Sequence, residues 1–289
     1  QVNVSNSVFE DNVVFASSSW ENLYNGGGFS VFSQSTVAAI TIRSSTFSRN
    51  LATNGGGLAM QGNLTLNIQN SLFEDNLASA RGGGVYVTSL NNSRFEATFT
   101  DAIFLGNGCP GWGGAVHSYS EGSGNMSFVR TNFTNNSAAY RDDETNATPS
   151  YRGGAYSAAG TDLFTSANSC VFEGNRAGSV GGAVDEGNRT DAIGGAVAVG
   201  SGTFFTWDCD FFNNTAYDGG AINAARDGDL LVQDTPYIVV RGGSMRHNIA
   251  LEGYCYTGLS NQDYCGHGGA LHAELGARVE LYDVVFDEN

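Results

Sequence analysis

Carboxylates, histidines and cysteines are the side chains of this chain whose type and spacing could support chemistry. Asp142, Asp143 and Glu144 follow one another directly, and Asp227 and Asp229 form a second short acidic group. Carboxylate oxygens are suitable ligands for Ca²⁺, but neither group has the spaced ligand set of an EF-hand or of a calcium-binding nonapeptide repeat. We therefore interpret both groups as charged surface segments.

No other group of side chains predicts catalysis or metal binding. His117 and His272 each occur two residues after the Ala of a Gly-Gly-Ala sequence, where we expect both to face outward. They belong to repeats that are not adjacent, so they do not predict a shared metal site. The sequence contains no nucleophile elbow, no phosphate-binding loop and no Cys/His metal spacing. We expect no catalytic residue, no metal site and no cofactor. A polysaccharide lyase or hydrolase with carboxylates contributed by loops remains an alternative.

Two short motifs recur along the chain and predict the elements that position these side chains. The mean period is about 35 residues, which indicates a repeat architecture. The first motif is Phe-x-x-Asn, with Met replacing Phe once, at Phe9–Asn12, Phe47–Asn50, Phe73–Asn76, Phe104–Asn107, Phe133–Asn136, Phe172–Asn175, Phe211–Asn214, Met245–Asn248 and Phe286–Asn289. The second is Gly-Gly-(Gly/Ala)-apolar, beginning at Gly26, Gly55, Gly82, Gly113, Gly153, Gly181, Gly194, Gly219 and Gly268.

Alternation around the Phe predicts the path of the chain in each repeat. The seventh and fifth residues before the Phe are mostly apolar, as in Leu66 and Ile68, and indicate a half-buried strand. The second residue before the Phe is mostly small and shares the parity of the Phe, but not that of the earlier apolar pair. The inward side therefore shifts by one residue between two strands, which indicates a corner. We therefore predict an all-β fold, a right-handed parallel β-helix of about nine coils, in which the Phe rings stack. The Asn is expected at a tight turn, where its side chain bonds neighbouring backbone or the next Asn.

Composition limits the partners of such a solenoid. The chain has 13 Arg, no Lys and 29 acidic residues, giving a net charge of −16, so nucleic acid is an unsuitable partner. It contains no apolar run of 18 residues, so we expect no membrane span in it. Residues 1–289 are predicted to form one continuous β-helix, a fragment of a longer repeat array, with insertions at 139–151, 185–193 and 251–267. Such loops commonly form contact surfaces or carry glycans.

The sequons and the cysteines favour a secreted protein. Cys255 and Cys265 flank a short polar loop and are predicted to form a disulfide. Cys170 and Cys209 occupy the same inward column of neighbouring repeats, where either a disulfide or two buried free thiols would fit, and Cys109 is predicted to be a buried free thiol. The candidate N-glycosylation sites are Asn3, Asn63, Asn91, Asn125, Asn132, Asn135, Asn146, Asn188 and Asn213.

The paired motifs resemble the repeats of the chlamydial polymorphic outer-membrane proteins, which also occur in β-helical surface proteins of algae and protists. Five Gly-Gly-Ala-(Ile/Leu/Val) motifs end at Val116, Val184, Val197, Ile222 and Leu271. The resemblance covers essentially the whole chain and implies secretion, a β-helix and a role in adhesion or surface structure. It implies no catalytic residue. Because of the sequons, we expect an algal or protist extracellular member.

These observations favour an extracellular structural glycoprotein: a rigid rod of a cell-surface coat, appendage or filament. Its expected partners are further copies of itself or other surface proteins, together with covalent N-glycans. The alternative is an adhesin that binds a host protein or glycan through the loops at 139–151 and 251–267.

Overall fold

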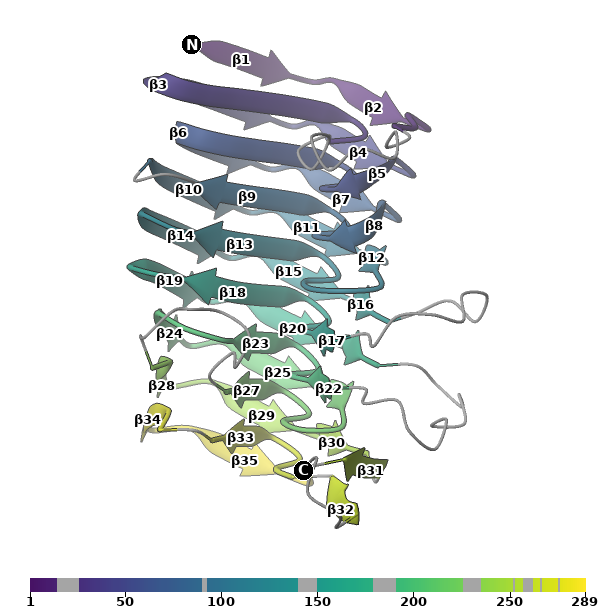
Figure 1. Cartoon of the computed structure of the whole chain (residues 1–289), viewed down its shortest axis with the longest axis vertical. Helices are drawn as coiled ribbons and strands as arrows, with labels where there is room; N and C mark the ends of the chain where they lie inside the picture. The colour runs from purple at the N-terminus through teal and green to yellow at the C-terminus, as the bar shows by residue number, and fades with distance from the viewer. Residues whose placement is uncertain are drawn as a thin grey trace.

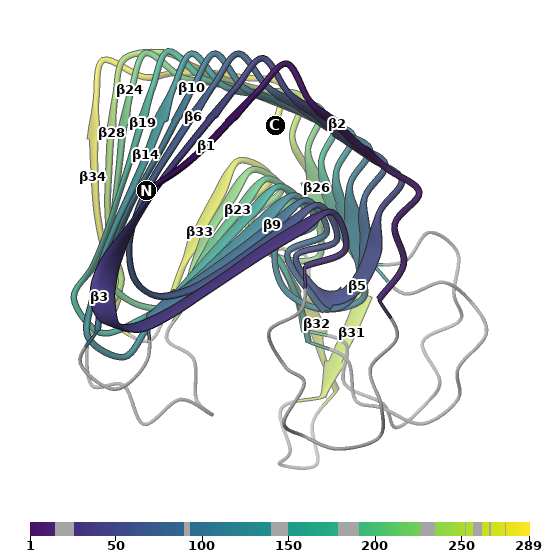
Figure 2. The same ribbon diagram turned by 90° about the horizontal axis from the view of Figure 1, so that it is seen from above.

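The chain folds into a parallel β-helix, as predicted from its repeats (Figure 1). The computed structural model describes residues 1–14, 26–89, 93–139, 150–178, 191–225, 235–251, 253–256, 262–265, 267–274 and 276–289. These residues form strands and turns and contain no helix. Seen along the rod, successive coils superimpose, and their sides enclose a common interior (Figure 2).

Two sides of the rod belong to one 15-stranded sheet. The long strands β3 (Phe29–Arg43) and β6 (Leu58–Gln69) contribute to both sides. Strands that follow the Gly-Gly motifs form the glycine side: β9 (Val85–Ser89), β13 (Val116–Ser120), β18 (Tyr156–Gly160), β23 (Val197–Val199), β27 (Ile222–Ala224) and β33 (Leu271–Ala273). The next strands form the long side: β1 (Val2–Ser5), β10 (Arg94–Thr100), β14 (Ser123–Val129), β19 (Leu163–Asn168), β24 (Thr203–Trp207), β28 (Tyr237–Arg241) and β34 (Arg278–Tyr282).

The remaining sides follow the Phe-x-x-Asn motifs. A nine-stranded sheet, the phenylalanine side, has one strand per coil: β2 (Val8–Glu10), β4 (Thr46–Ser48), β7 (Leu72–Glu74), β11 (Ile103–Leu105), β15 (Asn132–Thr134), β20 (Val171–Glu173), β25 (Asp210–Phe212), β29 (Ser244–Arg246) and β35 (Val285–Asp287). A seven-stranded sheet comes after it: β5 (Leu51–Asn54), β8 (Leu77–Arg81), β12 (Gly108–Cys109), β16 (Ser137–Ala138), β21 (Arg176–Ala177), β26 (Thr215–Ala216) and β30 (Ile249–Ala250).

Parts of the predicted insertions form two small sheets outside this frame. Strands β17 (Ser150–Arg152) and β22 (Asp191–Ile193) pair in parallel. Strands β31 (Gly253–Tyr256) and β32 (Gln262–Cys265) form an antiparallel pair. Most other residues of the three insertions lie outside the described residues.

The corner predicted before each Phe is a residue in the left-handed backbone region. This column has φ between 46° and 65°, and Asn and Asp, which tolerate that region better than other side chains, hold five of its nine positions. Its members are Asn6, Ser44, Asn70, Asp101, Arg130, Ser169, Asp208, Gly242 and Asp283. Because the chain turns at this residue, the inward parity changes between the long side and the phenylalanine side.

A second left-handed column lies two residues after each Phe or Met of the motif, at the predicted Asn turn. The turn was predicted from the Asn, but its left-handed residue was not. The members of this column are Asp11, Arg49, Asp75, Gly106, Asn135, Gly174, Asn213, His247 and Glu288. The residue after each of them is the repeated Asn, so this second corner turns the Asn side chain into the interior. Asn50, Asn76, Asn107, Asn136 and Asn175 are all fully buried.

The Asn side chains form a hydrogen-bonded ladder through the interior, as predicted. The Nδ2 of Asn107 donates to the Oδ1 of Asn136 at 3.0 Å and to the carbonyl oxygen of Phe73 at 2.8 Å. The backbone N–H of Asn107 donates to the same Oδ1 at 3.0 Å. Equivalent side-chain bonds of 2.8–3.0 Å join every neighbouring pair from Asn12 to Asn289. Each buried amide of the ladder thereby has hydrogen-bond partners, as a dry interior requires.

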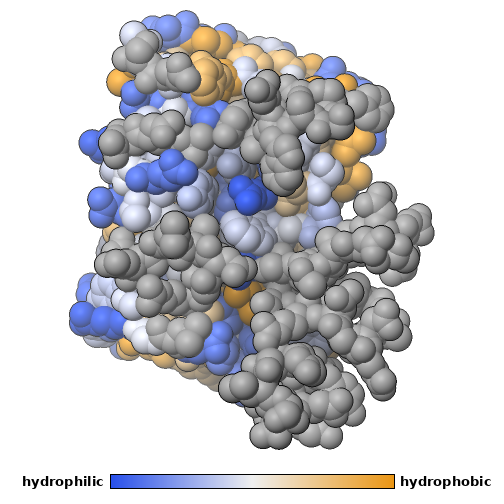
Figure 3. All heavy atoms as spheres, viewed as in Figure 1, coloured by the Kyte–Doolittle hydropathy of each residue, from blue (hydrophilic) through white to orange (hydrophobic). Residues whose placement is uncertain are grey.

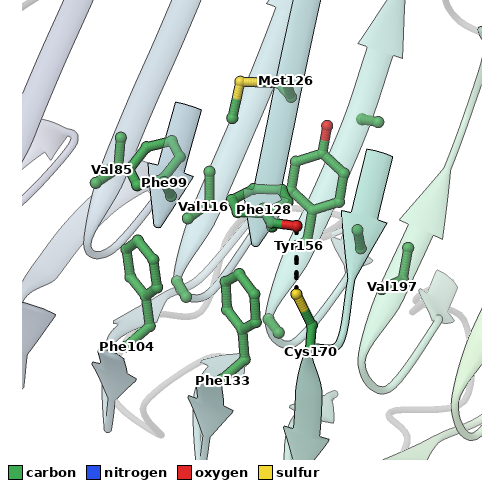
Figure 4. Close-up of a cluster of buried hydrophobic side chains, with 14 of the residues drawn as sticks. Val85, Phe99, Phe104, Val116, Met126, Phe128, Phe133, Tyr156, Cys170 and Val197 are labelled. Atoms are coloured by element: carbon green, nitrogen blue, oxygen red, sulfur yellow. Dashed lines mark hydrogen bonds between the residues drawn. The ribbon is translucent and has the colours of Figure 1, made fainter. Parts of the chain in front are cut away.

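The Phe rings stack in a second axial column beside this ladder. From Phe9 to Phe211, neighbouring ring centroids lie 4.6–5.0 Å apart with interplanar angles of 3–12°. This spacing follows from the separation of adjacent strands, about 4.8 Å. Figure 4 shows Phe104 and Phe133 of this column packed against Phe99, Phe128 and other interior residues.

The Gly-Gly motifs return each coil to the glycine side. The first Gly is left-handed, for example Gly82 at φ 61° and Gly113 at φ 69°. The second Gly meets the next coil so closely that a Cβ on Gly83 would lie 2.3 Å from the carbonyl oxygen of Gly114. Glycine is needed at both positions, because one requires the backbone conformation and the other the close approach.

Candidate functional site

The two acidic groups considered as calcium ligands lie outside the described residues. Within the described part of the chain, no three His, Cys, Asp or Glu side chains are arranged so that they could hold a metal ion. The described residues also contain no helix that is long and apolar enough to cross a membrane.

The outward carboxylates before the Phe motifs occupy the first corner and do not form a catalytic pair. Asp101 forms a bidentate ion pair with Arg130 of the next coil, with Nε–Oδ1 and Nη2–Oδ2 distances of 2.7 and 2.8 Å. The hydrogen bond from Arg130 lowers the pKa of Asp101. Asp208 and Asp283 occupy the same column in other coils. A lowered pKa keeps Asp101 ionised, which suits an ion pair and not a general acid.

His117 lies on the outward parity of the glycine side, but it is fully buried. Its ring stacks on Tyr86 at 5.7 Å and meets Trp112 edge to face at 5.4 Å. Burial and the nearby cation of Arg81 lower its pKa well below the usual value. Among the described residues neither ring nitrogen has a hydrogen-bond partner. His117 is therefore a neutral packing residue at working pH.

His272 lies in the same column as His117, with one residue from each of three coils between them. Its Nδ1 lies 3.0 Å from the Nδ2 of Asn223. Its ring stacks on His267, which lies 3.0 Å from a carboxylate oxygen of Asp218.

The three cysteines that the structure describes in full are buried free thiols. Cys109 fills the small inward position after its Asn, and burial raises its pKa to about 12. Cys170 and Cys209 stack in one column, where the N–H of Cys170 donates to the Sγ of Cys209 at 3.3 Å. Ser45 and Ser71 form the same bond in other coils at 3.2 Å. The hydrogen bond with the neighbouring thiol of Cys170, together with burial, raises the pKa of Cys209. High thiol pKa values argue against nucleophilic cysteines at Cys109 and Cys209.

Cys255 and Cys265 lie on the paired strands β31 and β32. In this register Cys255 is opposite Asp263, and Cys265 is opposite Gly253. Their side chains lie outside the described set, so the disulfide stays a prediction.

Six of the nine sequon asparagines are described. Asn3, Asn132, Asn135 and Asn213 are exposed. Asn63 and Asn125 are partly exposed. The others, Asn91, Asn146 and Asn188, lie outside the described residues, and glycosylation of all nine stays a prediction.

A shallow hollow of about 480 Å³ lies beside the long side. It is lined by Asp162, Leu163, Phe164, Gly202, Thr203 and Thr235. This lining has one carboxylate and no histidine or cysteine, so it lacks the acid and base pair of a hydrolase. The face of the rod seen in Figure 3 shows hydrophilic described residues with hydrophobic ones scattered among them from the N-terminal to the C-terminal end.

One cluster was missed by the sequence analysis: rings and guanidinium groups on the outer surface of strands β24, β28 and β34. Phe205 and Trp207 lie with ring centroids 3.9 Å apart. The guanidinium of Arg241 lies over the rings of Phe205 and Tyr282. Alternation along each strand could have placed these side chains outward. No repeat period singles them out, because each outward position differs from coil to coil.

Comparison with known protein families places a repeat motif in the C-terminal half of the chain. Residues 208–225 match the Chlamydia polymorphic membrane protein repeat. This segment contains one Phe-x-x-Asn motif, Phe211–Asn214, and one Gly-Gly-Ala motif that ends at Ile222. Searches of curated proteins and of solved structures gave no significant match. The chain thus carries a repeat of the polymorphic membrane protein class, which supports a β-helical protein of the cell surface.

Proposed function

We propose that this chain of polymorphic membrane protein repeats is an extracellular structural glycoprotein, a rigid rod that contributes to a cell-surface coat, appendage or filament. The observation that carries the proposal is the unbroken Asn ladder, which joins Asn12 to Asn289 through all nine coils. The parallel Phe stack adds apolar packing along the same axis. Such a continuous interior supports a stiff element of fixed length.

The outer surface supports the same role. The net charge of −16 favours solubility of a long solenoid outside the cell. Asn132, Asn135 and Asn213 are exposed sequon residues where N-glycans would project from the rod. Further copies of this chain, or other surface proteins, would then be its partners.

Surface labelling and microscopy test this function. Intact source cells would be treated with a membrane-impermeant protease or labelled with immunogold against this chain. We expect gold on regular coats, appendages or filaments, and a mass loss on N-glycosidase treatment. Label found only inside the cell would contradict the proposal.

A second candidate function is adhesion, because the resemblance to polymorphic membrane protein repeats implies a role in adhesion or surface structure. The loops at 139–151 and 251–267 would then contact a host protein or glycan. Deleting both loops should abolish cell binding by an adhesin and leave assembly of a structural rod intact. Deletion of 185–193 is the matched control, since it shortens a third insertion. Binding that survives the double deletion would argue against adhesion through these loops.

A further inference from the structure

The outer surface of the long side changes in chemistry along the rod. In β6 and β10 its outward positions are polar: Thr65, Asn67, Gln69, Glu96, Thr98 and Thr100. In the C-terminal coils the same columns hold rings and guanidinium groups. We call this set the aromatic–arginine face: Phe205, Trp207, Tyr237, Val239, Arg241, Arg278, Glu280 and Tyr282.

The side chains of this face form one connected network. Arg241 lies 5.4 Å from the ring centre of Phe205 and 4.8 Å from that of Tyr282. The hydroxyl of Tyr282 donates to Glu280 at 2.7 Å, and Glu280 forms an ion pair with Arg278. Arg278 in turn lies 4.8 Å from the ring centre of Tyr237. Because these contacts already fix the rotamers, binding through this face would cost little side-chain entropy.

Folding of the β-helix does not require this network. The inward residues of the same strands, such as Phe204, Ile238 and Val240, already belong to the core. The N-terminal coils fold with polar outward residues on the same sheet. Yet Trp207 and Tyr282 remain 39% and 43% exposed. Exposed rings gathered on one flat sheet face indicate an interaction surface, and Trp, Tyr and Arg are the residues that dominate the energy of protein interfaces.

The charges around this face fit a second copy of the chain. Arg278 is neutralised by Glu280, whereas Arg241 has no carboxylate partner among the described residues. The exposed corner residues Asp208 and Asp283 directly follow Trp207 and Tyr282, so carboxylates border the same face. Donor and acceptors thus occur on one surface, as a two-fold interface between identical chains requires. A polyanion would bring no cation to these carboxylates, whereas a second copy brings Arg241.

We propose that the aromatic–arginine face is a lateral interface at which two copies of this chain pair about a two-fold axis. The rings of one copy bury those of the other, and Arg241 of each copy meets the bordering carboxylates Asp208 and Asp283 of its partner. This inference rests on the structural role proposed above for its biological meaning, but pairing in solution can be measured without it.

Sedimentation equilibrium of the whole glycosylated chain tests the interface. The wild type should show a reversible monomer–dimer equilibrium. The double variant Trp207→Ser/Tyr282→Ser should weaken the dimer by tenfold or more, because central aromatic residues dominate interface energies. Arg241→Asp should weaken it as well, because it places a carboxylate opposite carboxylates.

Two substitutions serve as matched controls. Phe32→Ser removes a ring that is 56% exposed but lies outside the face. Arg43→Asp makes the same charge change in the column that contains Arg241, at the other end of the long side. Both should dimerise like the wild type, and circular dichroism melts should establish that every variant is folded.

Two results would overturn the proposal: a wild type that stays monomeric at all concentrations, or Arg241→Asp and the double ring variant dimerising as tightly as the controls. If the double ring variant does not fold, Arg241→Asp alone decides. Surface labelling of a chain that stays monomeric would sustain the proposed location while rejecting this interface. Dimers of a chain found only inside cells would sustain this interface and reject the proposed location at the cell surface.

Discussion

The interior aromatic stack and the exterior aromatic cluster meet on the coil that contains Trp207 and Phe211, and they obey different rules. Phe172 and Phe211 occupy a column that every coil repeats, with centroids 4.6 Å apart and no exposed surface. Trp207 belongs to a column whose other members include Arg43, Gln69 and Thr100. The difference teaches that the fold dictates the interior of this solenoid and leaves the outer columns free for interactions.

Replacing one ring from each cluster gives the largest contrast. Phe172→Ala should lower the free energy of unfolding by about 3–5 kcal/mol, because it opens a cavity in a ring stack that cannot close around it. Trp207→Ser should lower that of the monomer by less than about 1 kcal/mol, as expected for a surface position. Urea unfolding at low protein concentration measures both. Equal losses would remove the distinction between the two clusters.

The Asn ladder offers the second largest effect. Asn136→Ala should cost about 3 kcal/mol, because it removes the acceptor of Asn107 and leaves buried donors without partners. The matched control is Asn132→Ala, an exposed residue four positions earlier in the same coil. Thermal unfolding of both variants compares them, and a neutral Asn136→Ala would mean that water replaces the missing amide.

His117 is an outward residue that is as buried as the interior side chains. The pH dependence of the free energy of unfolding should reveal this burial. Since its folded pKa is well below the unfolded value, the unfolded state binds the extra proton as the pH falls below about 6.5. The contribution to stability is present above that pH and is lost toward the lower folded pKa. Between pH 7.5 and 5, the wild type should lose about 2 kcal/mol more than His117→Gln. If the free energies of unfolding of the wild type and His117→Gln change in parallel with pH, the imidazole is accessible to water.

The corner columns should give the smallest effect, and of opposite sign. Ser169 has φ 53°, a conformation in which Cβ is strained. Ser169→Gly should therefore stabilise the fold by about 0.5–1 kcal/mol. The greater conformational entropy of glycine in the unfolded chain reduces this gain. Ser166→Gly on the adjacent strand, where φ is not left-handed, should destabilise instead. Chemical denaturation of the pair would show whether the corner is strained, and two losses of equal size would argue that it is not.

The predictability of each region follows from this contrast. The ring stack and the bonding of the Asn side chains were predicted, because nearly every coil repeats the same residue type at those positions. The first corner was predicted from the change of inward parity before the Phe. A turn was predicted at the repeated Asn, but its left-handed residue was missed, because Asp11, Arg49 and Gly106 share a backbone conformation and no side-chain type. Burial of His117 was missed because parity alone assigns it to the outside. The aromatic–arginine face was missed because outward positions have no period.

The Asn ladder also gives the rod a sense of direction. Within the ladder, every Nδ2 donates to the Oδ1 of its C-terminal neighbour, as from Asn76 to Asn107 and from Asn175 to Asn214. The side-chain amide dipoles therefore all point in the same direction along the rod. Aligned dipoles polarise one another and strengthen the row as a whole. A coil of reversed orientation would place the Nδ2 donor of its Asn against the Nδ2 donor of a neighbouring Asn. The rod is therefore polar along its length. Two rods that pair about a two-fold axis perpendicular to their length must run in opposite directions.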